Sequence, residues 1–401
     1  MNGYKPKEIT AIAEILKAYT NEAIEGPFNV AYSGGKDSTV TLALVMRALM
    51  MLPREKWTRR IYITSAQTFL DLTTDATKQN EFVKIQKLID KQQLPMEIAE
   101  VSAKPGSTIL DCILGKGYPL PHSNDKWCTH KAKIEPQERF MKEKQFALAV
   151  VGTRIAESKQ RAETIGSMAA EGDVFYAERK DKKGKVVATS LQPIVHFTTE
   201  DVWTYLATEK TPWGDAEEIS QLYKDATGEC GLRRRKAGKD ETGDACGARF
   251  GCVICPVVTI DRSTQELSKK KPWFQPYADL RDTMIRMYKD PKNRSGHRRN
   301  GMKLAYGQGT FTVKARMELF ELFMAAEEDN RILARYHGVE PQPLFTEELV
   351  ERIKQQWQED LASKPWLEDA EELGRFFEVK LKGANEGYQV EWNHYYDTPG
   401  A

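Results

Sequence analysis

A short glycine turn carrying hydroxyl and charged side chains follows an apolar run near the start of the sequence. The apolar run covers residues 28–32, and the turn reads S-G-G-K-D-S over residues 33–38. Glycine lets a backbone approach an anion closely, and the unpaired N–H groups at the start of a helix point at it. Lys36 adds a cation, and Ser33 and Ser38 add hydroxyl donors. The pattern predicts a phosphate-binding loop between a buried strand and a helix over residues 37–52.

The turn differs from two common phosphate-binding motifs and resembles a third. It lacks the G-x-x-x-x-G-K-[ST] of the Walker A loop and the G-x-G-x-x-G of dinucleotide-binding folds. It matches every fixed position of S-G-G-x-D-S, the motif of PP-loop ATP pyrophosphatases, which cleave ATP between its α- and β-phosphates. The resemblance implies that an oxygen of the substrate becomes adenylylated, so that AMP can later depart.

A second group of charged side chains follows another predicted strand. The apolar run over residues 147–154 ends at Gly152 and Arg154, and Glu157 and Arg161 come next. Arginine heads form fixed, bidentate hydrogen bonds to phosphate, so Arg154 and Arg161 are candidates to grip one. Glu157 is expected to orient one of them or to hold Mg²⁺. The alternative is a solvated, charged start of a helix.

Four of the six cysteines lie close together in the sequence. Such a group in a reducing compartment favours a metal site over disulfides. Iron–sulfur clusters tolerate loose spacing and often have a proline after the last cysteine, whereas zinc sites usually have two close cysteine pairs. The spacing favours a [4Fe–4S] cluster, with structural zinc as the weaker alternative. The candidate ligands are Cys230, Cys246, Cys252 and Cys255.

A further cysteine, Cys128, lies in a polar and aromatic segment over residues 115–136, which we expect to be a loop that leads into a helix. Lys131 and Lys133 follow it, so the segment is a candidate to hold an anionic substrate. Lys131 is also expected to lower the pKa of the Cys128 thiol, which would let the thiolate carry a persulfide. The alternative is a surface loop with a buried cysteine.

The predicted elements alternate in type along the first half of the chain. This alternation is typical of an α/β fold with a doubly wound parallel sheet, in which ligands bind at the carboxyl ends of the strands. Residues 171–187 are polar and predict an exposed hairpin or loop. Further strands are expected over residues 60–65, 95–101, 147–154 and 189–194, and helices over residues 6–23, 68–90, 196–206, 313–326, 329–337 and 346–361.

Length and charge limit the remaining possibilities. A chain of 401 residues predicts several domains, which we place at residues 1–215, 216–310 and 311–401. Because 59 basic and 58 acidic residues leave a net charge of +1, a nucleic-acid site must be a local patch. No apolar run reaches the ~20 residues of a membrane span, and no signal peptide is evident, so we expect a cytoplasmic protein without a membrane partner.

Basic runs accompany the cysteines and are candidates to contact a polyanion. They cover residues 233–236, 269–271 and 294–299, with Lys239 between the first two. Aromatic side chains among them could stack on bases, and a solvated charged face is the alternative. These aromatic residues are Trp273, Phe274 and Tyr277.

Four segments occur in an order that resembles the PAPS reductase-like family of PP-loop proteins: residues 33–38, 127–136, 152–161 and 246–256. The stretch over residues 246–255 is most similar to the DNA phosphorothioation proteins DndC and SspD. The resemblance implies a HUP-like fold of the adenine nucleotide alpha hydrolase type, with a cysteine-rich cluster-binding segment and a helical C-terminal part. It implies ATP, Mg²⁺ and a [4Fe–4S] cluster, and as partners DNA, a cysteine desulfurase and other phosphorothioation proteins.

The same resemblance implies a reaction and its residues. ATP activates a DNA phosphate by adenylylation with pyrophosphate release, and sulfur then replaces a non-bridging oxygen. The nucleotide would be bound by Ser33, Gly34, Gly35, Lys36, Asp37, Ser38, Gly152 and Glu157, with Lys36, Asp37, Arg154, Arg161 and Cys128 as catalytic candidates. The intact PP-loop argues against reduction of PAPS itself, because PAPS reductases do not cleave ATP.

Two other functions fit the same residues. One is a different PP-loop sulfurtransferase or adenylyltransferase, acting in tRNA thiolation or sulfate assimilation. The other is a DNA-binding subunit whose nucleotide site is a switch and whose cysteines hold structural zinc.

Overall fold

The structure is a computed structural model that describes residues 4–170, 172–180, 183–227, 251–258 and 260–364. Its contacts divide the chain into two compact units, each built from separate stretches of sequence. Unit 1 contains residues Met1–Ile109, Pro121–Asp282 and Ala325–Leu344, and unit 2 contains Leu110–Leu120, Thr283–Met324 and Phe345–Ala401. The three domains expected from the sequence stay a prediction.

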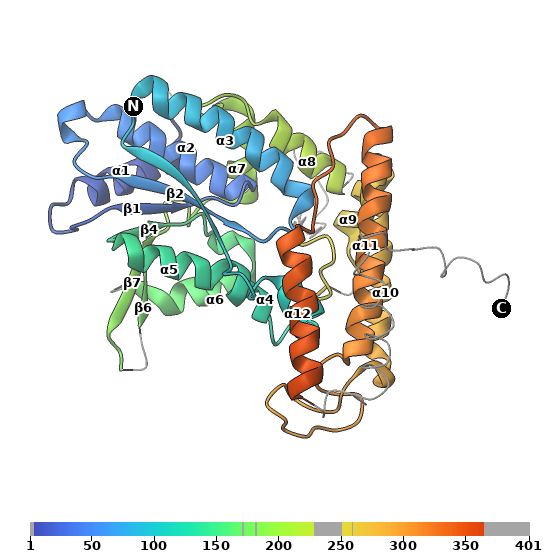
Figure 1. Cartoon of the computed structure of the whole chain (residues 1–401). Helices are drawn as coiled ribbons and strands as arrows, with labels where there is room; N and C mark the ends of the chain where they lie inside the picture. The colour runs from blue at the N-terminus through green and yellow to red at the C-terminus, as the bar shows by residue number, and fades with distance from the viewer. Residues whose placement is uncertain (1–3, 171, 181–182, 228–250, 259, 365–401) are drawn as a thin grey trace, which may run out of the picture. The chain divides into compact units, whose positions relative to one another are not determined.

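Unit 1 contains a seven-stranded sheet in the order β3-β2-β1-β4-β7-β6-β5 (Figure 1). The strands β3, β2, β1, β4 and β7 run parallel, whereas β6 and β5 are antiparallel at one edge. The doubly wound α/β fold is therefore confirmed, with a mostly parallel sheet. The strands are β1 (Phe28–Ala31), β2 (Ile61–Gln67), β3 (Met96–Ser102), β4 (Leu148–Val150), β5 (Ala169–Ala170), β6 (Asp173–Lys180) and β7 (Val186–Leu191).

The connections of the sheet create a switch point at β1. Helices α2 (Lys36–Met51) and α3 (Leu72–Gln92) carry the chain from β1 through β2 to β3. The chain then returns through α5 (Glu135–Lys144) to β4, which pairs with the other side of β1. Since such crossovers are right-handed, α5 covers the opposite face of the sheet, as Figure 1 shows. Ligands of open α/β sheets bind at such a point, beyond the carboxyl ends of the strands.

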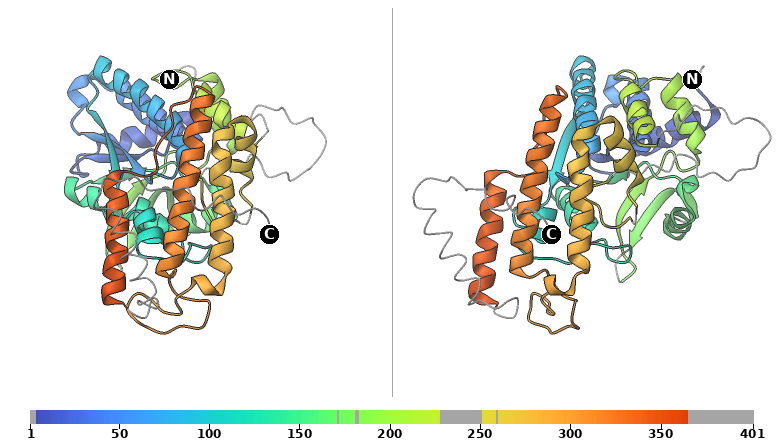
Figure 2. Two further views of the ribbon diagram at one scale, coloured as in Figure 1. Left: turned by 45° about the vertical axis from the view of Figure 1, so that its right-hand side comes forward. Right: turned by 90° about the vertical axis from the view of Figure 1, so that its right-hand side faces the viewer.

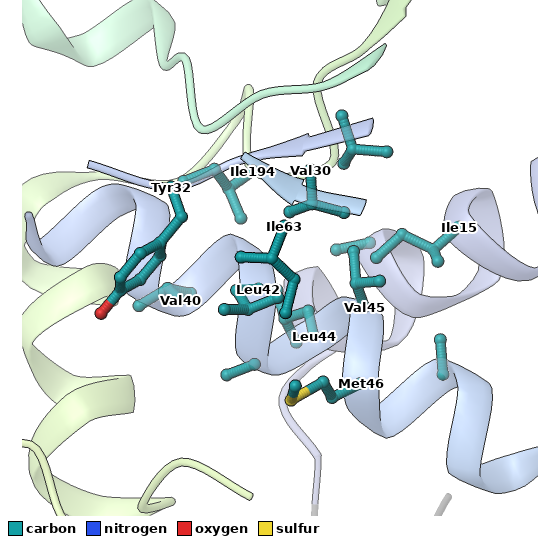
Figure 3. Packing of buried hydrophobic residues seen from close by; sticks show 14 of the residues in the cluster. Ile15, Val30, Tyr32, Val40, Leu42, Leu44, Val45, Met46, Ile63 and Ile194 are labelled. Carbon is teal, nitrogen blue, oxygen red and sulfur yellow. The ribbon is translucent and has the colours of Figure 1, made fainter. Parts of the chain in front are cut away.

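The alternation of side chains along β2 explains the two covered faces. Ile61 and Ile63 belong to the buried cluster on the α2 face (Figure 3). Tyr62 points to the other face, where its ring lies 5.6 Å from Phe140 and 5.3 Å from Phe146. Because successive residues of a strand face opposite ways, one apolar run fills two layers of the core.

The remaining helices of the chain fall largely where periodicity predicts them. The predicted helix over residues 6–23 is α1, which ends at Thr20, and the polar segment after residue 171 is the β6–β7 hairpin. The helices are α1 (Pro6–Thr20), α4 (Trp127–Thr129), α6 (Lys159–Met168), α7 (Thr199–Thr208), α8 (Glu217–Thr227), α9 (Arg262–Lys270), α10 (Gln275–Lys289), α11 (Val313–Tyr336) and α12 (Glu347–Ser363).

Unit 2 is built around aromatic side chains and the buried carboxylate of Asp360. The ring of Phe320 lies 5.5 Å from those of Phe345 and Trp357, and the indole N–H of Trp357 donates to the Leu114 carbonyl at 2.7 Å. Asp360 is completely buried nearby and pairs with arginine side chains of the same unit. Among the described residues, no helix of either unit combines the length and apolar character needed to cross a bilayer.

Two predicted features of the chain are wrong in detail. The two helices expected over residues 313–326 and 329–337 are one helix, α11, because the intervening residues include no Gly or Pro. The loop expected to carry Cys128 is helical, since α4 and a helical turn over His130–Ile134 lead directly into α5.

Candidate active site

The S-G-G-K-D-S turn lies between the carboxyl end of β1 and the start of α2. Gly34 adopts φ +76°, which favours glycine, and a Cβ there would lie 3.1 Å from the Cβ of Lys78. The turn is closed from within, because the Ser33 N–H donates to Ser38 Oγ at 3.2 Å and the Ser38 hydroxyl donates to the Gly35 carbonyl at 2.9 Å. Gly35 directly precedes α2, so the helix start faces the loop as predicted.

Gly152 and Arg154 come from the end of β4, the strand on the other side of the switch point. A Cβ at Gly152 would lie 2.9 Å from both the Asp37 carbonyl oxygen and Thr41 Oγ1, so the first turn of α2 requires glycine here. Arg154 is 2 % exposed, and its Nε–H donates to Asp37 Oδ1 at 2.7 Å. Its Nη1 also donates to the Phe197 carbonyl at 3.3 Å. Arg154 therefore positions Asp37, rather than reaching outward toward a phosphate.

Lys36 is held between a carboxylate and an aromatic ring. Its ammonium lies 3.3 Å from Asp37 Oδ2 and 5.1 Å from the centre of the Tyr223 ring. Its backbone N–H donates to the Tyr223 hydroxyl at 3.4 Å. Helix α8, which carries Tyr223, therefore packs over the start of α2 and fixes the one lysine of the loop.

A buried ion pair on α3 borders the loop as well. The Lys78 ammonium donates to Asp75 at 2.7 Å and to Gln67 at 3.2 Å, and both side chains of the pair are largely buried. Burial raises the pKa of Asp75, and the charge of Lys78 opposes that rise. Because Lys78 also packs against Gly34, a second buried cation adjoins the predicted phosphate site.

Glu157 and Arg161 form an exposed pair at the start of α6. The Arg161 Nε–H donates to Glu157 at 3.1 Å, and Ser158 caps the helix by accepting from the Arg161 N–H. The Arg161 side chain is 43 % exposed, unlike that of Arg154. Of the two arginines, Arg161 is thus the one that a bound anion could recruit from solvent.

Three thiols converge at the same edge of the sheet. The Val253 N–H donates to the Leu70 carbonyl at 2.9 Å, which fixes the segment of Cys252 and Cys255 beside the start of α3. Cys128 lies near Cys255, and Cys252 lies near Cys128, Cys255 and Asp71. The fold therefore brings Cys128 near Cys252 and Cys255, the last two cysteines of the predicted cluster.

The environment of Cys128 contradicts the expected activation by Lys131. Burial raises the pKa of the Cys128 thiol, and the nearby Cys255 raises it further. Lys131 instead pairs with Glu135 at 3.2 Å, one helical turn away. Burial also raises the pKa of Cys252 well above its usual range, and Asp71 adds to the rise while Lys133 opposes it. Lys133 itself is tied to Asp71 at 3.0 Å.

The described thiols fit part of a metal site. Thiolates are the donors that an iron–sulfur cluster or structural zinc requires. Cys230 and Cys246 lie outside the described residues, and within those residues no set of three metal-binding side chains is close enough to hold an ion. Cys128, Cys252 and Cys255 carry the donor type that such a site uses, and the predicted metal site with Cys230 and Cys246 stays a prediction.

Several side chains predicted to contact a polyanion are either buried or held in ion pairs. Phe274 and Tyr277 are buried in the core, because their faces fall on the inner side of α10 and the turn before it. Lys269 pairs with Glu266 and Lys270 with Asp225. Arg294 is buried as well. The basic run over residues 233–236 and Lys239 lie outside the described residues.

The sequence interpretation missed Lys78, Asp75 and Tyr223. The first two fall on the stripe of α3 that carries the buried residues Phe82 and Ile85. A Lys–Asp pair on an apolar stripe is a signal that could have been found, since such charges are rarely buried without a partner or a role. Tyr223 has no such signal, because its place against Lys36 depends on the packing of α8.

A glycine-rich loop at the switch point of a doubly wound sheet, with a lysine and a positioned aspartate, defines a nucleotide-utilising α/β enzyme of the PP-loop type. Residues 27–257 match the phosphoadenosine phosphosulfate reductase domain, and this match covers more than half of the chain. The chain therefore belongs to that family.

A curated relative and three solved structures show further similarity. An uncharacterized protein of Methanocaldococcus jannaschii is 26% identical over 290 residues, which are 71% of this chain and 46% of the relative. The chain thus spans less than half the length of that relative.

The structures have low similarity scores. PAPS reductase from Candida auris in complex with phosphate has a TM-score of 0.32 at 14% identity, covering 52% of this chain and 84% of that one. FMN adenylyltransferase from Candida glabrata with FMN and an ATP analogue has a TM-score of 0.33 at 14% identity, covering 57% and 66%. The U34-tRNA thiolase NcsA from Methanococcus maripaludis with its [4Fe-4S] cluster has a TM-score of 0.33 at 12% identity, covering 69% and 81%. At these scores they support no inference about activity.

Proposed function

We propose that this chain is an ATP pyrophosphatase that transfers sulfur to the DNA backbone. The observation that carries the proposal is that the PP-loop and a group of cysteine thiols lie at the same edge of the sheet. An intact PP-loop with Lys36 and Asp37 lies at the switch point, and the segment that carries Cys252 and Cys255 lies beside the start of α3, with Cys128 nearby. Nucleotide activation and thiol chemistry are the two halves of such a reaction.

In the first step, a non-bridging oxygen of a DNA phosphate attacks the α-phosphorus of ATP. The bond between the α-phosphorus and the α,β-bridging oxygen breaks, and pyrophosphate leaves. Gly34, Gly35 and the start of α2 would receive the pyrophosphate portion on backbone N–H groups, and Lys36 would offset its growing charge. Mg²⁺, when bound by Asp37 or Glu157, would neutralise the phosphates further. The Arg154 side chain keeps Asp37 in place during this step.

In the second step, sulfur at the oxidation level of sulfide attacks the adenylylated phosphorus. AMP leaves with the former DNA oxygen, so the phosphate gains one sulfur and loses one oxygen without a change in oxidation state. A cysteine desulfurase would supply the sulfur as a persulfide, and a small-molecule thiol would reduce its outer sulfur by two electrons to sulfide while itself being oxidised to a disulfide.

A [4Fe–4S] cluster fits the donor set that adjoins the site. We propose Cys128, Cys246, Cys252 and Cys255 as its ligands, with Cys230 as the alternative to Cys128. With all four cysteines bound, such a cluster would supply electrons, whereas with three bound it would also offer a non-ligated iron for sulfide. Structural zinc on the same thiols remains the competing assignment.

Sulfur transfer can be measured directly. The full chain is incubated with a cysteine desulfurase, ³⁵S-cysteine, dithiothreitol, ATP and duplex DNA under exclusion of oxygen, and the label in digested DNA is counted. We expect ATP-dependent label in DNA, reduced ~100-fold or more in Lys36→Met, because one preorganised charge at the leaving group is lost.

Lys87→Met is the matched control, since Lys87 is exposed on α3. Wild-type labelling by Lys36→Met would remove the PP-loop from the reaction. Label that enters tRNA and not DNA would favour the tRNA thiolation alternative.

A further inference from the structure

Unit 2 contains a long basic loop between α10 and α11. We call residues 291–312 the basic loop; Figure 2 shows it joining the ends of these two helices. Between Asp290 and Glu318 the sequence has lysines and arginines but no acidic residue, in a chain whose net charge is only +1. Such a local excess of one charge is the electrostatic signature expected of a contact with a polyanion.

Some arginines of this stretch are bound within the protein, and others remain exposed. The Arg294 guanidinium is buried, lies 3.9 Å from the centre of the Tyr288 ring, and donates to the Gly309 carbonyl at 3.2 Å. Arg299 donates to both carboxylate oxygens of Asp360, at 2.6 and 2.7 Å. These two arginines therefore build the base of the loop and are not available to a partner.

Backbone pairing makes the loop a fixed hairpin. Isolated bridges join Arg294 to Phe311 and His297 to Lys303. The Arg298 N–H donates to the Met302 carbonyl at 2.8 Å, which closes the tip. At Gly309, φ is +91° and a Cβ would collide with the backbone of His297, so the two sides of the hairpin lie in direct contact. The tip is thus presented on a rigid support, which lowers the entropy cost of binding.

The side chains that remain at the surface are basic or aromatic. Arg298 and Lys303 are exposed, and no ion pair involves either of them within the described part of the chain. Tyr306 is 79% exposed and Met302 is 52% exposed. Two unneutralised cations and an exposed aromatic ring on one hairpin combine phosphate attraction with a stacking surface.

We propose that the tip of the basic loop, through Arg298, Lys303 and Tyr306, contacts the phosphodiester backbone and bases of a nucleic acid. The choice of nucleic acid as the polyanion rests on the proposed function; the surface itself rests on the contacts above. The hairpin is not an amphipathic helix, which a membrane-surface site would favour. An exposed aromatic ring on the same hairpin as unpaired cations is the combination that binds single strands through stacking.

The test is a salt titration of nucleic-acid binding by the full chain. Fluorescence anisotropy of labelled duplex and single-stranded DNA is measured for the wild type, Arg298→Gln/Lys303→Gln, and the control Lys56→Gln/Lys87→Gln. The control removes the same charge from exposed lysines of unit 1. The slope of log K against log salt is negative, and loss of two phosphate contacts should make it shallower by about 1.8 on duplex DNA. The same loss should weaken binding about fiftyfold at 0.1 M salt.

Tyr306→Ala gives an independent readout. It should weaken binding to single strands about tenfold and leave the salt slope unchanged, because stacking releases no counterions. Equal slopes and affinities for the wild type and the Arg298/Lys303 variant would overturn the loop assignment, as would binding to phosphatidylserine vesicles without binding to DNA. Loop-dependent DNA binding by a chain that never cleaves ATP would instead overturn the proposed function and leave this inference standing.

Discussion

Asp37 is the residue at which the two phosphate motifs of the sequence meet. One carboxylate oxygen accepts from Arg154 and the other faces Lys36. The sequence predicts that Arg154 grips a phosphate, because an arginine head forms fixed, bidentate hydrogen bonds to phosphate. The fold buries it instead, so its charge acts through Asp37. The sequence shows the residue spacing within each motif. The contact between the two motifs could not be predicted, because it depends on β4 lying beside β1.

The assignment of Cys128 as a cluster ligand can be tested by metal analysis. Protein purified without oxygen should contain about four iron and four acid-labile sulfide per chain, and Cys128→Ser should lower both. Cys112→Ser is the control, since Cys112 is a buried thiol of unit 2. Wild-type iron content in Cys128→Ser would contradict Cys128 as a ligand and favour Cys230 as the fourth ligand of the cluster. Stoichiometric zinc without sulfide would contradict the cluster itself.

At the scale of elements, α3 shows that a sequence pattern predicts which helix residues are buried but not which residues its charged side chains contact. Its apolar stripe predicts the buried residues Phe82 and Ile85, and both are buried. The N-terminal end of the same helix carries Asp75 and Lys78 to the PP-loop and sets Asp71 beside Lys133. Strand and helix types were predictable because each has a period. The partners of charged side chains were not, because they come from elements distant in sequence.

Helix α12 is anchored by Asp360, and this anchor predicts a pH dependence of stability. Burial raises the pKa of Asp360, but hydrogen bonds from Arg299 and the charge of Arg316 outweigh it and hold the pKa at about 2. Since this lies below the ordinary value of 3.8, the carboxylate stabilises the fold above about pH 4. That contribution, about 2 kcal/mol, should be lost as the pH falls from about 4 to about 2.

Asp360→Asn should therefore lower the free energy of unfolding by about 3 kcal/mol at pH 7, because it leaves buried arginine charges without a partner. The difference from the wild type should shrink between about pH 4 and pH 2. Urea unfolding at a series of pH values measures both effects, with Asp90→Asn as an exposed control on α3. A pH-independent difference would show that the Asp360 charge does not matter to stability.

At the scale of the whole molecule, the chain is nearly neutral, and its excess basic residues are concentrated in particular segments. Unit 1 contains the sheet, the PP-loop and the converging thiols, and unit 2 contains the buried Asp360 network and the basic loop. The net charge of +1 excluded a generally basic protein but gave no position for a basic surface. Only the contacts distinguish Arg298, which is exposed, from its neighbour Arg299, which is tied to Asp360.

The central claim is that this chain cleaves ATP between the α- and β-phosphates. The most direct measurement is chromatography of the products formed from α-³²P-labelled ATP by the anaerobically purified chain with Mg²⁺ and duplex DNA, for the wild type and Asp37→Asn. We expect AMP from the wild type, with an equal amount of pyrophosphate, and a loss of ~100-fold or more in Asp37→Asn, in which an uncharged amide replaces the carboxylate that Arg154 holds. Formation of ADP and phosphate, or nucleotide binding without cleavage, would contradict the account.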